Sequence, residues 1–184
     1  MAEALDPALP PAVDALAQRV LREACDAELR LATAESCTGG LLASLLTDIP
    51  GMSHAFECGF VVYTHEAKRE ILGVSAEILD GDGAVSEACA RAMAEGALAH
   101  SHADLAAAIT GFTDGGPGQP GGLVHFACAR RGQPTTHRKL ELGDVGRARV
   151  RIAALEIALS MLADQLGAEE QPTPRRASPA GRGP

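Results

Sequence analysis

The stretch Thr33-Ala34-Glu35-Ser36-Cys37-Thr38-Gly39-Gly40 joins an apolar segment at residues 29–34 to a helical pattern over residues 39–47. A hydroxyl, a thiol and two glycines therefore lie where a strand is predicted to become a helix. Such a turn holds a nucleophile rigidly, and the unpaired N–H groups of the following helix can stabilise an oxyanion. The same residues also fit a tight turn in which Ser36 or Thr38 caps the helix. This stretch alone leaves both interpretations open.

Strand-like and helical patterns alternate on both sides of this turn. We predict strands at residues 29–34, 56–63, 105–110, 123–130 and 135–142. We predict helices at residues 12–27, 39–47, 66–72, 86–99 and 145–166, with Ser86 as an N-cap. This alternation indicates a single α/β/α layered domain with helices on both faces of a mixed, roughly five-stranded sheet, whose last two strands form a hairpin.

The two ends of the chain differ from this pattern. Residues 1–11 contain three prolines and are predicted to be a flexible leader, whereas residues 12–166 carry the domain. Residues 167–184 are rich in proline, glycine and arginine, and such a composition cannot bury enough apolar surface to stay ordered. We predict a disordered tail there.

Composition narrows the class of protein. The chain has 184 residues, 46% of them hydrophobic, which suits one domain with a sizeable core. A net charge of −8 argues against a broad phosphate-binding surface, so nucleic acid is not expected as a partner. No apolar run approaches the roughly 18 residues of a membrane helix, and no signal peptide is recognisable. The five cysteines form no C-x-x-C pair, so we expect a reducing compartment, the cytoplasm.

A serine nucleophile at position 36 needs a base, and two residue types qualify. None of the six histidines has a neighbouring acid with an obvious orienting role. Lys68 lies just beyond the strand at residues 56–63, at the opening of a helix, and can meet Ser36 if the two strands adjoin. A desolvated lysine can lose its proton near pH 7. Tyr63, the only tyrosine, could relay protons or orient Lys68.

Each of these residues also has a simpler interpretation. Lys68 fits an ordinary solvated helix lysine, and Tyr63 fits a boundary aromatic with a wet hydroxyl. Cys37 could act as a thiol nucleophile, although a buried structural cysteine is favoured over it. The segment His100-Ser101-His102-Ala103-Asp104 has a metal-like spacing, but it fits better the end of a helix entering a strand.

Four motifs together carry a resemblance to a known family. They are Thr33 to Gly40 as quoted above, Gly59-Phe60-Val61-Val62-Tyr63-Thr64-His65-Glu66-Ala67-Lys68, Gly83-Ala84-Val85-Ser86-Glu87, and Thr110-Gly111. In these motifs the chain resembles the C-terminal domain of the CinA family over roughly residues 12–166. Stand-alone members of that family include nicotinamide-nucleotide amidohydrolases (PncC), which convert nicotinamide mononucleotide to nicotinate mononucleotide and ammonia.

The resemblance implies roles for particular residues. Ser36 would be the nucleophile and Lys68 its general base, with Tyr63 assisting. Backbone N–H groups near Thr38, Gly39 and Gly40 would hold the oxyanion, although this helix end could instead receive the substrate phosphate. The family also implies a homodimer and no metal, and we expect no cofactor.

Two further contacts complete the predicted site. Thr110, at the end of a buried strand, is the best additional polar contact, although its hydroxyl could simply bond its own backbone. The family's Gly-Asp-Arg is here Gly143-Asp144-Val145, so an arginine suited to phosphate is lost. Arg149 or Arg147 could substitute within about one helical turn.

The loop between residues 111 and 122 departs from the family's usual sequence, which leaves three hypotheses for function. The first is hydrolysis of nicotinamide mononucleotide by Ser36 and Lys68. The second is a catalytically silent interaction domain linked to competence or DNA damage, as the family name suggests. The third is hydrolysis of a different amide in a pocket reshaped by the unusual loop.

Overall fold

A mixed five-stranded sheet forms the centre of the molecule in the computed structural model, which describes residues 9–167. The strands lie in the order β2-β1-β3-β4-β5. Their bounds are β1 Leu31–Glu35, β2 Phe56–Val61, β3 Leu105–Gly111, β4 Leu123–Arg130 and β5 Thr136–Glu141. β1 pairs in parallel with β2 and β3, whereas β3–β4 and β4–β5 are antiparallel. The predicted mixed sheet and its closing hairpin are therefore confirmed.

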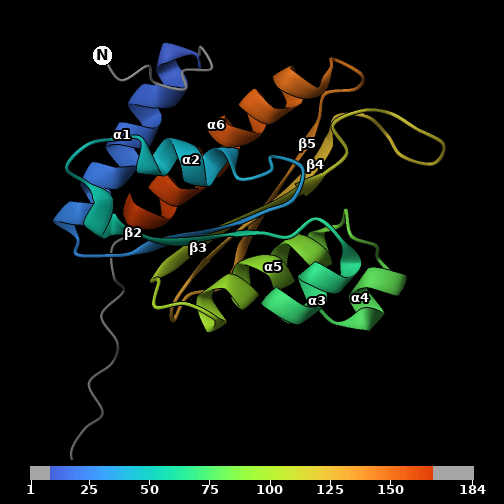
Figure 1. The fold of residues 1–184 in the computed structure, drawn as a ribbon, viewed down its shortest axis with the longest axis horizontal. Coiled ribbons are helices and arrows are strands. Elements are labelled where there is room, and N and C mark those ends of the chain that lie inside the picture. The colour runs from blue at the N-terminus through green and yellow to red at the C-terminus, as the bar shows by residue number, and fades with distance from the viewer. Residues whose placement is uncertain (1–8, 168–184) are drawn as a thin grey trace, which may run out of the picture.

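Helices cover both faces of this sheet (Figure 1). One face carries α1 Pro11–Asp26, α2 Leu41–Thr47 and α6 Arg147–Gly167, and the other carries α3 His65–Leu72, α4 Ala76–Asp80 and α5 Glu87–Ala99. Each face has its own cluster of buried apolar side chains. Strand β3 separates the two clusters and contributes consecutive buried alanines at 106, 107 and 108. These small side chains let helices on both faces approach the sheet closely.

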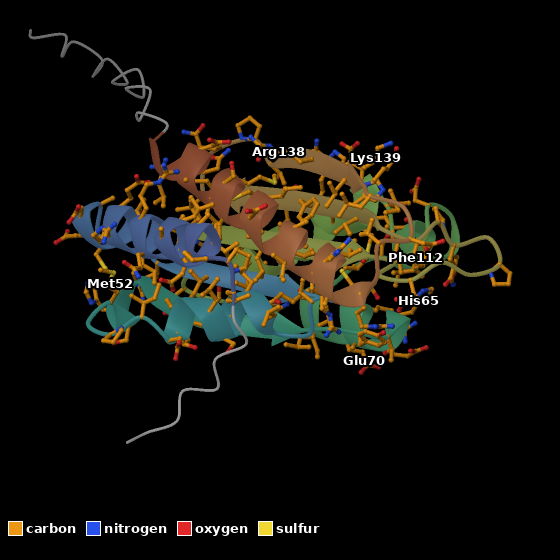
Figure 2. The ribbon with its side chains drawn as sticks, turned by 90° about the horizontal axis from the view of Figure 1, so that it is seen from above. Met52, His65, Glu70, Phe112, Arg138 and Lys139 are labelled. Carbon is orange, nitrogen blue, oxygen red and sulfur yellow. The ribbon has the colours of Figure 1, made fainter. Side chains whose placement is uncertain are left out.

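The two edges of the sheet differ in character. β5 is exposed and carries charged side chains, and Figure 2 shows Arg138 and Lys139 pointing outward along that edge. Charges on an edge strand discourage pairing with another chain. β2 forms the other edge and leads directly into the segment that precedes α3.

Several boundaries differ from those predicted. α2 begins at Leu41 rather than Gly39, because Gly39 and Gly40 take left-handed backbone angles, φ 65° and 93°, that end the preceding turn. The short helix α4 and the 3-10 turn Ser53–Ala55 were not predicted. α1 begins at Pro11 and α6 ends at Gly167, whereas residues 1–8 of the predicted leader and residues 168–184 of the predicted tail lie outside the described residues.

The topology creates a crevice where strands β1 and β2 end. The helix that follows β1, α2, packs on one face, whereas α3, which follows β2, packs on the other. Ligands of α/β sheets bind at such a switch point, outside the carboxyl ends of the strands. Figure 2 shows His65 and Phe112 at this end of the molecule and Met52 at the other. Within residues 9–167, no helix combines the length and the apolar character that crossing a bilayer requires.

Candidate active site

Ser36 lies immediately after β1, at the switch point. Its backbone N–H donates a hydrogen bond of 3.0 Å to the carbonyl oxygen of Ile109 on β3. On the other side, the N–H of Val62 donates to the Glu35 carbonyl oxygen at 2.9 Å, which extends the pairing of β1 with the chain beyond β2. Ser36 is 8% exposed. The backbone that carries its hydroxyl is therefore held by sheet hydrogen bonds on both sides.

Lys68 reaches Ser36 from the second turn of α3. Its Nζ lies 3.1 Å from Ser36 Oγ and donates a hydrogen bond of 2.9 Å to the Val62 carbonyl oxygen. The residue is only 1% exposed. Helix α3 is held in place by Thr64, whose Oγ1 accepts a hydrogen bond from Ala67 N at 3.1 Å. The structure thus brings together the two side chains that the sequence analysis assigned to nucleophile and base, and Lys68 is not the solvated helix lysine of the simpler interpretation.

The surroundings of Lys68 favour its neutral form. Burial lowers the pKa of the amine from its ordinary value of 10.5, since an ammonium loses its hydration there. The thiols of Cys89 and Cys37 nearby act weakly in the opposite direction. No carboxylate pairs with Lys68 within the described part of the chain. A neutral amine can accept the Ser36 hydroxyl proton while one of its own N–H groups donates to Val62.

The N-terminus of α2 is closed by a carboxylate from within the chain. Glu35 is fully buried, and its Oε2 and Oε1 accept hydrogen bonds from the backbone N–H groups of Leu42 at 3.0 Å and Ala43 at 2.8 Å. The N-cap position is Gly40, and neither Ser36 nor Thr38 caps the helix through its side chain. The helix end that the sequence analysis offered to a substrate phosphate is therefore occupied by Glu35.

The loop between Ser36 and α2 offers a restricted set of hydrogen-bond donors. The N–H of Gly39 donates to the Ser36 carbonyl oxygen at 3.1 Å and is not available to a substrate. The N–H groups of Thr38 and Gly40 have no acceptor within residues 9–167, whereas the N–H of Cys37 lies beside its own thiol. Thr38 Oγ1 is also buried without a hydrogen-bond partner. Of the predicted oxyanion donors, Thr38 and Gly40 thus remain free, and Gly39 does not.

A pocket of about 230 Å³ adjoins this loop. Its lining includes Cys37, Tyr63, Phe112 and Arg147, together with Gly111, Thr113, Asp114, Gly115 and Gln119. Tyr63 is 68% exposed, and its hydroxyl makes no hydrogen bond within the described residues. The structure therefore places Tyr63 at the mouth of the site but forms no relay from its phenol to Lys68. Its assisting role stays a prediction.

The other predicted substrate contacts, Thr110 and the two arginines of α6, differ in whether they reach the pocket. Thr110 Oγ1 donates a hydrogen bond of 2.6 Å to the Ala84 carbonyl oxygen, so its proton is already engaged. Arg149 is exposed on α6 and is absent from the pocket lining, whereas Arg147 lines the pocket and pairs with Asp114. Of the two arginines considered from the sequence, Arg147 is therefore the one that the structure brings to the site.

Two residues at the site were missed by sequence reasoning. One is Glu35, although an acid directly before a Ser-Cys-Thr-Gly-Gly turn is a usable signal for a buried helix cap. The other is Arg151, whose Nε donates a hydrogen bond of 2.8 Å to the Cys37 carbonyl oxygen. No local sequence signal identifies Arg151, because its partner lies 114 residues away in the chain.

The geometry gives less support to a thiol nucleophile at Cys37 and to a metal site at residues 100–104. Burial raises the pKa of the Cys37 thiol to about 11, and this outweighs the smaller effects of its backbone hydrogen bond and Arg151. A thiolate nucleophile is therefore disfavoured near neutral pH. His100 Nδ1 contacts the Gly96 carbonyl, His102 contacts Glu57, and Asp104 accepts from the Arg30 backbone. These three side chains do not converge on one point.

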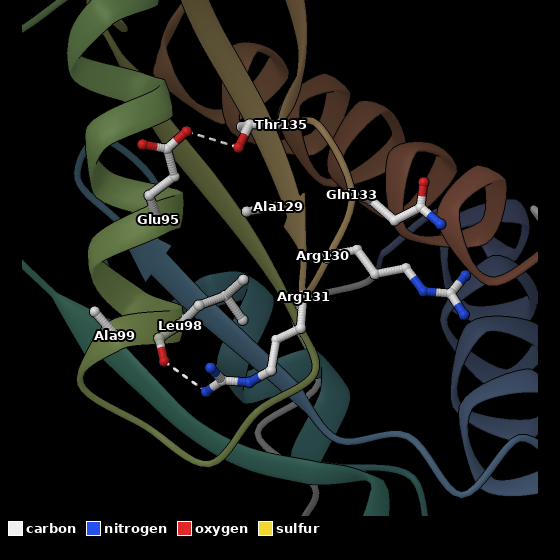
Figure 3. Close-up of a pocket in the computed structure, with 9 residues that line it drawn as sticks. Glu95, Leu98, Ala99, Ala129, Arg130, Arg131, Gln133 and Thr135 are labelled. Atoms are coloured by element: carbon white, nitrogen blue, oxygen red, sulfur yellow. Dashed lines mark hydrogen bonds between the residues drawn. The ribbon is translucent and has the colours of Figure 1, made fainter. Parts of the chain in front are cut away.

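A second, larger cavity lies at the opposite end of the sheet (Figure 3). Its volume is about 470 Å³, and it is bordered by the end of α5 and the turn between β4 and β5. Thr135 donates to Glu95 at 2.7 Å, and Arg131 donates to the Leu98 carbonyl at 2.7 Å. Arg130 pairs with the first residue of β3, which places this cavity far along the sheet from Ser36. Two of its polar side chains, Thr135 and Arg131, are thus engaged in holding the end of α5.

Comparison with known proteins gives a consistent result. The family model of the CinA C-terminal domain matches residues 13–166. A CinA-like protein of Syntrophotalea carbinolica is 43% identical over 157 residues, covering 84% of this chain and 38% of that protein. A CinA-like protein of Akkermansia muciniphila is 48% identical over 130 residues, covering 69% of this chain and 31% of that protein. The chain thus spans about a third of the length of these curated relatives.

A solved structure agrees in fold over nearly its full length. The competence/damage inducible protein CihA from Agrobacterium tumefaciens superposes with a TM-score of 0.83 at 42% sequence identity, covering 86% of this chain and 98% of that one. The similarity therefore includes both the β1–β2 switch point and the helices that surround it.

Proposed function

The chain belongs to the CinA C-terminal domain family, and from this premise we propose that it is an amidohydrolase that converts nicotinamide mononucleotide to nicotinate mononucleotide and ammonia. The observation that supports the proposal most strongly is the 3.1 Å contact between Lys68 Nζ and Ser36 Oγ. A buried lysine without a carboxylate partner costs stability, and such a group is retained where its neutral form is needed.

The reaction proceeds in two halves. Ser36 Oγ attacks the carboxamide carbon and its proton passes to Lys68 Nζ, which gives a tetrahedral oxyanion. The oxyanion collapses, the C–N bond breaks, and Lys68 returns the proton to the departing ammonia. Water then attacks the acyl-enzyme ester, giving its proton to Lys68, and the C–O bond to Ser36 breaks. Lys68 passes this proton to Ser36 Oγ, which restores the serine hydroxyl, and nicotinate mononucleotide leaves.

The phosphate of this substrate requires a cation away from α2, because Glu35 closes that helix end. Arg147 is the only basic residue in the lining of the pocket beside Tyr63, and it pairs with Asp114. We infer that the phosphate exchanges with Asp114 at Arg147. The pocket, at about 230 Å³, is smaller than the roughly 300 Å³ at which small-molecule sites usually begin, so the loop 112–122 must yield to admit a nucleotide.

The Arg147–Asp114 pair also favours a second candidate function. If Asp114 keeps its place, the charge of Arg147 is neutralised within the pocket, and an amide without a phosphate fits better than a phosphorylated one. The altered loop is fastened at its base, where the Asp144 carboxylate packs against Gly115 and Gly121. Hydrolysis of a different amide, one without a phosphate, is therefore the alternative.

Ammonia release from nicotinamide mononucleotide tests the proposal. We expect turnover by the wild type, and a loss of several orders of magnitude in kcat for Ser36→Ala and for Lys68→Ala, since nucleophile and base act as a unit. Cys37→Ala is the matched control, because it alters the neighbouring side chain and leaves Ser36 and Lys68 in place.

The outcomes separate the three hypotheses. Release of ammonia from nicotinamide riboside, and not from nicotinamide mononucleotide, would favour an amide without a phosphate. The absence of turnover on either compound at micromolar enzyme would instead favour a silent interaction domain linked to competence or DNA damage. The family resemblance further supports a homodimer, and five free cysteines support a reducing compartment such as the cytoplasm.

A further inference from the structure

Arg151 joins α6 to the nucleophile loop. Its Nε donates a hydrogen bond of 2.8 Å to the carbonyl oxygen of Cys37, the residue after the nucleophile. The same guanidinium lies beside the next turn of the loop, since a Cβ placed on Gly39 would be 3.8 Å from Arg151 Nη2. A charged donor makes a stronger hydrogen bond than a neutral one. The carbonyl of Cys37 is therefore held toward α6.

Holding this carbonyl also fixes the N–H of the next residue. The Cys37–Thr38 peptide is planar and trans, so the Thr38 N–H points opposite to the Cys37 carbonyl. Helix α6 and α3 cover opposite faces of the sheet, and Lys68 meets Ser36 from α3. The Thr38 N–H is consequently directed away from α6, toward the side on which Ser36 and Lys68 meet.

We propose that Arg151 is a positioning residue that orients the Cys37–Thr38 peptide so that the Thr38 N–H serves as the oxyanion donor. The proposal rests on the acyl-transfer function proposed above. Arg151 acts here through the backbone and does not touch the reacting atoms.

Most other backbone N–H groups of this region are already bonded, which leaves few candidates for the oxyanion donor. Ser36 N–H donates to the Ile109 carbonyl oxygen, and Gly39 N–H donates to the Ser36 carbonyl oxygen. Leu41 N–H donates to the Thr38 carbonyl oxygen, and the next two N–H groups of α2 donate to Glu35. The N–H of Gly40 is free as well, but among the described residues a side chain from outside the loop holds only the peptide between Cys37 and Thr38. The buried, unpartnered Thr38 Oγ1 marks the same residue as a point where hydrogen-bonding capacity is left open.

The proposal predicts how an Arg151 variant divides its effect between kcat and KM. Loss of an oxyanion donor costs about 10²–10³ in kcat. Arg151 orients such a donor without being one, so we expect Arg151→Met to lower kcat roughly 10–100-fold, with KM within about threefold of the wild type. Arg151→Lys keeps the charge but loses the planar donor geometry, and we expect a smaller fall.

Matched controls distinguish this role from folding and from substrate binding. Arg22→Met removes an exposed arginine on α1 and should leave both constants unchanged. The thermal midpoint of Arg151→Met should remain close to that of the wild type. A large rise in KM with unchanged kcat would overturn the proposal, because Arg151 would then be binding the substrate directly. Unchanged kcat and KM would overturn it as well.

A second measurement keeps this test independent of the substrate. The burst of p-nitrophenol from p-nitrophenyl acetate, with mass spectrometry to locate the acetyl group on Ser36, reports acylation through the same oxyanion. If the wild type is acylated but does not deamidate nicotinamide mononucleotide, the proposed substrate fails, and the acylation rate of Arg151→Met still decides the role of Arg151. Acylation at the wild-type rate in Arg151→Met, or no acylation of wild-type Ser36, would overturn the proposal.

Discussion

At the scale of single residues, the chemistry depends on the proton of Lys68. An exposed lysine is protonated at neutral pH and cannot act as a base. The Lys68 side chain extends from α3 to a buried position near the end of β2, where it meets the Ser36 hydroxyl and the Val62 carbonyl. Within the described residues no carboxylate pairs with its ammonium form. Desolvation therefore dominates, and the pKa of Lys68 is lowered.

This lowered pKa predicts the pH dependence of the reaction. Only neutral Lys68 accepts the Ser36 proton, so kcat/KM should rise with pH through the lowered pKa of Lys68 and level off above it. Initial rates in overlapping buffers would measure the profile. A flat profile between about pH 6 and 9 would contradict the role of Lys68 as base.

Ser36 and Lys68 could be predicted from the sequence because Ser36 directly follows β1 and Lys68 lies at the start of the helix that follows β2, and the ends of adjacent parallel strands meet. Arg151 could not be predicted in this way. It is one of several arginines in the first turns of α6, and which of them faces the nucleophile loop depends on the rotation of that helix against the sheet. Arg149, the residue chosen from the sequence, lies two positions earlier on a different, exposed side of the helix.

At the scale of elements, the close crossing of α5 and α3 depends on Gly96. A Cβ at this position would lie 2.0 Å from the Leu72 carbonyl oxygen and 3.1 Å from the Leu72 Cβ. The glycine therefore lets the end of α3 approach α5, and α3 carries Lys68. The spacing of these helices is thus linked to the position of the base.

Substitution at Gly96 tests this link. Alanine favours an isolated helix over glycine by about 1 kcal/mol. At this crossing we nevertheless expect Gly96→Ala to destabilise the protein by roughly 1–3 kcal/mol, since the backbone carbonyl of Leu72 cannot yield as a flexible side chain would. Urea denaturation would measure the change. Gly167→Ala is the control, because no atom of the described residues lies within 4 Å of a Cβ placed there, and an equal loss of stability in this variant would contradict the packing argument.

The elements themselves were predicted to different degrees. Ser86 was identified as the N-cap of α5, and its Oγ accepts from Cys89 N at 3.1 Å, because capping is a local effect that the sequence records. Helix α4 was missed, since its five residues are too few to show a hydrophobic period. Its start is nevertheless capped by Ser75, whose Oγ accepts from Ile78 N at 3.3 Å.

At the scale of the whole molecule, the buried amine opposes folding. In the unfolded chain Lys68 is solvated and keeps its ordinary pKa of 10.5, whereas the folded state lowers that pKa. The unfolded state thus binds more protons between the two values, and stability rises with pH across that window. Below the lowered pKa the full cost of burying the ammonium is present, and near pH 10.5 it is relieved.

Replacement of Lys68 by an apolar side chain should remove this cost. We expect Lys68→Met to be inactive but more stable than the wild type at pH 7, by roughly 1–2 kcal/mol. The difference should shrink as the pH approaches 10.5. Chemical denaturation of both proteins at pH 7 and pH 10 measures it. A Lys68→Met protein that is less stable at pH 7 would indicate that the hydrogen bonds of Lys68 outweigh its desolvation.

The exposed ring of Tyr63 has a consequence for how this molecule can be observed. The chain contains one tyrosine and no tryptophan, so its ultraviolet emission comes almost entirely from a single phenol. That phenol lies in the lining of the pocket and is already in contact with solvent in the folded state. Its fluorescence should therefore change little on unfolding. It should change when a pyridine ring or another ligand binds beside it, so Tyr63 is an intrinsic probe of binding.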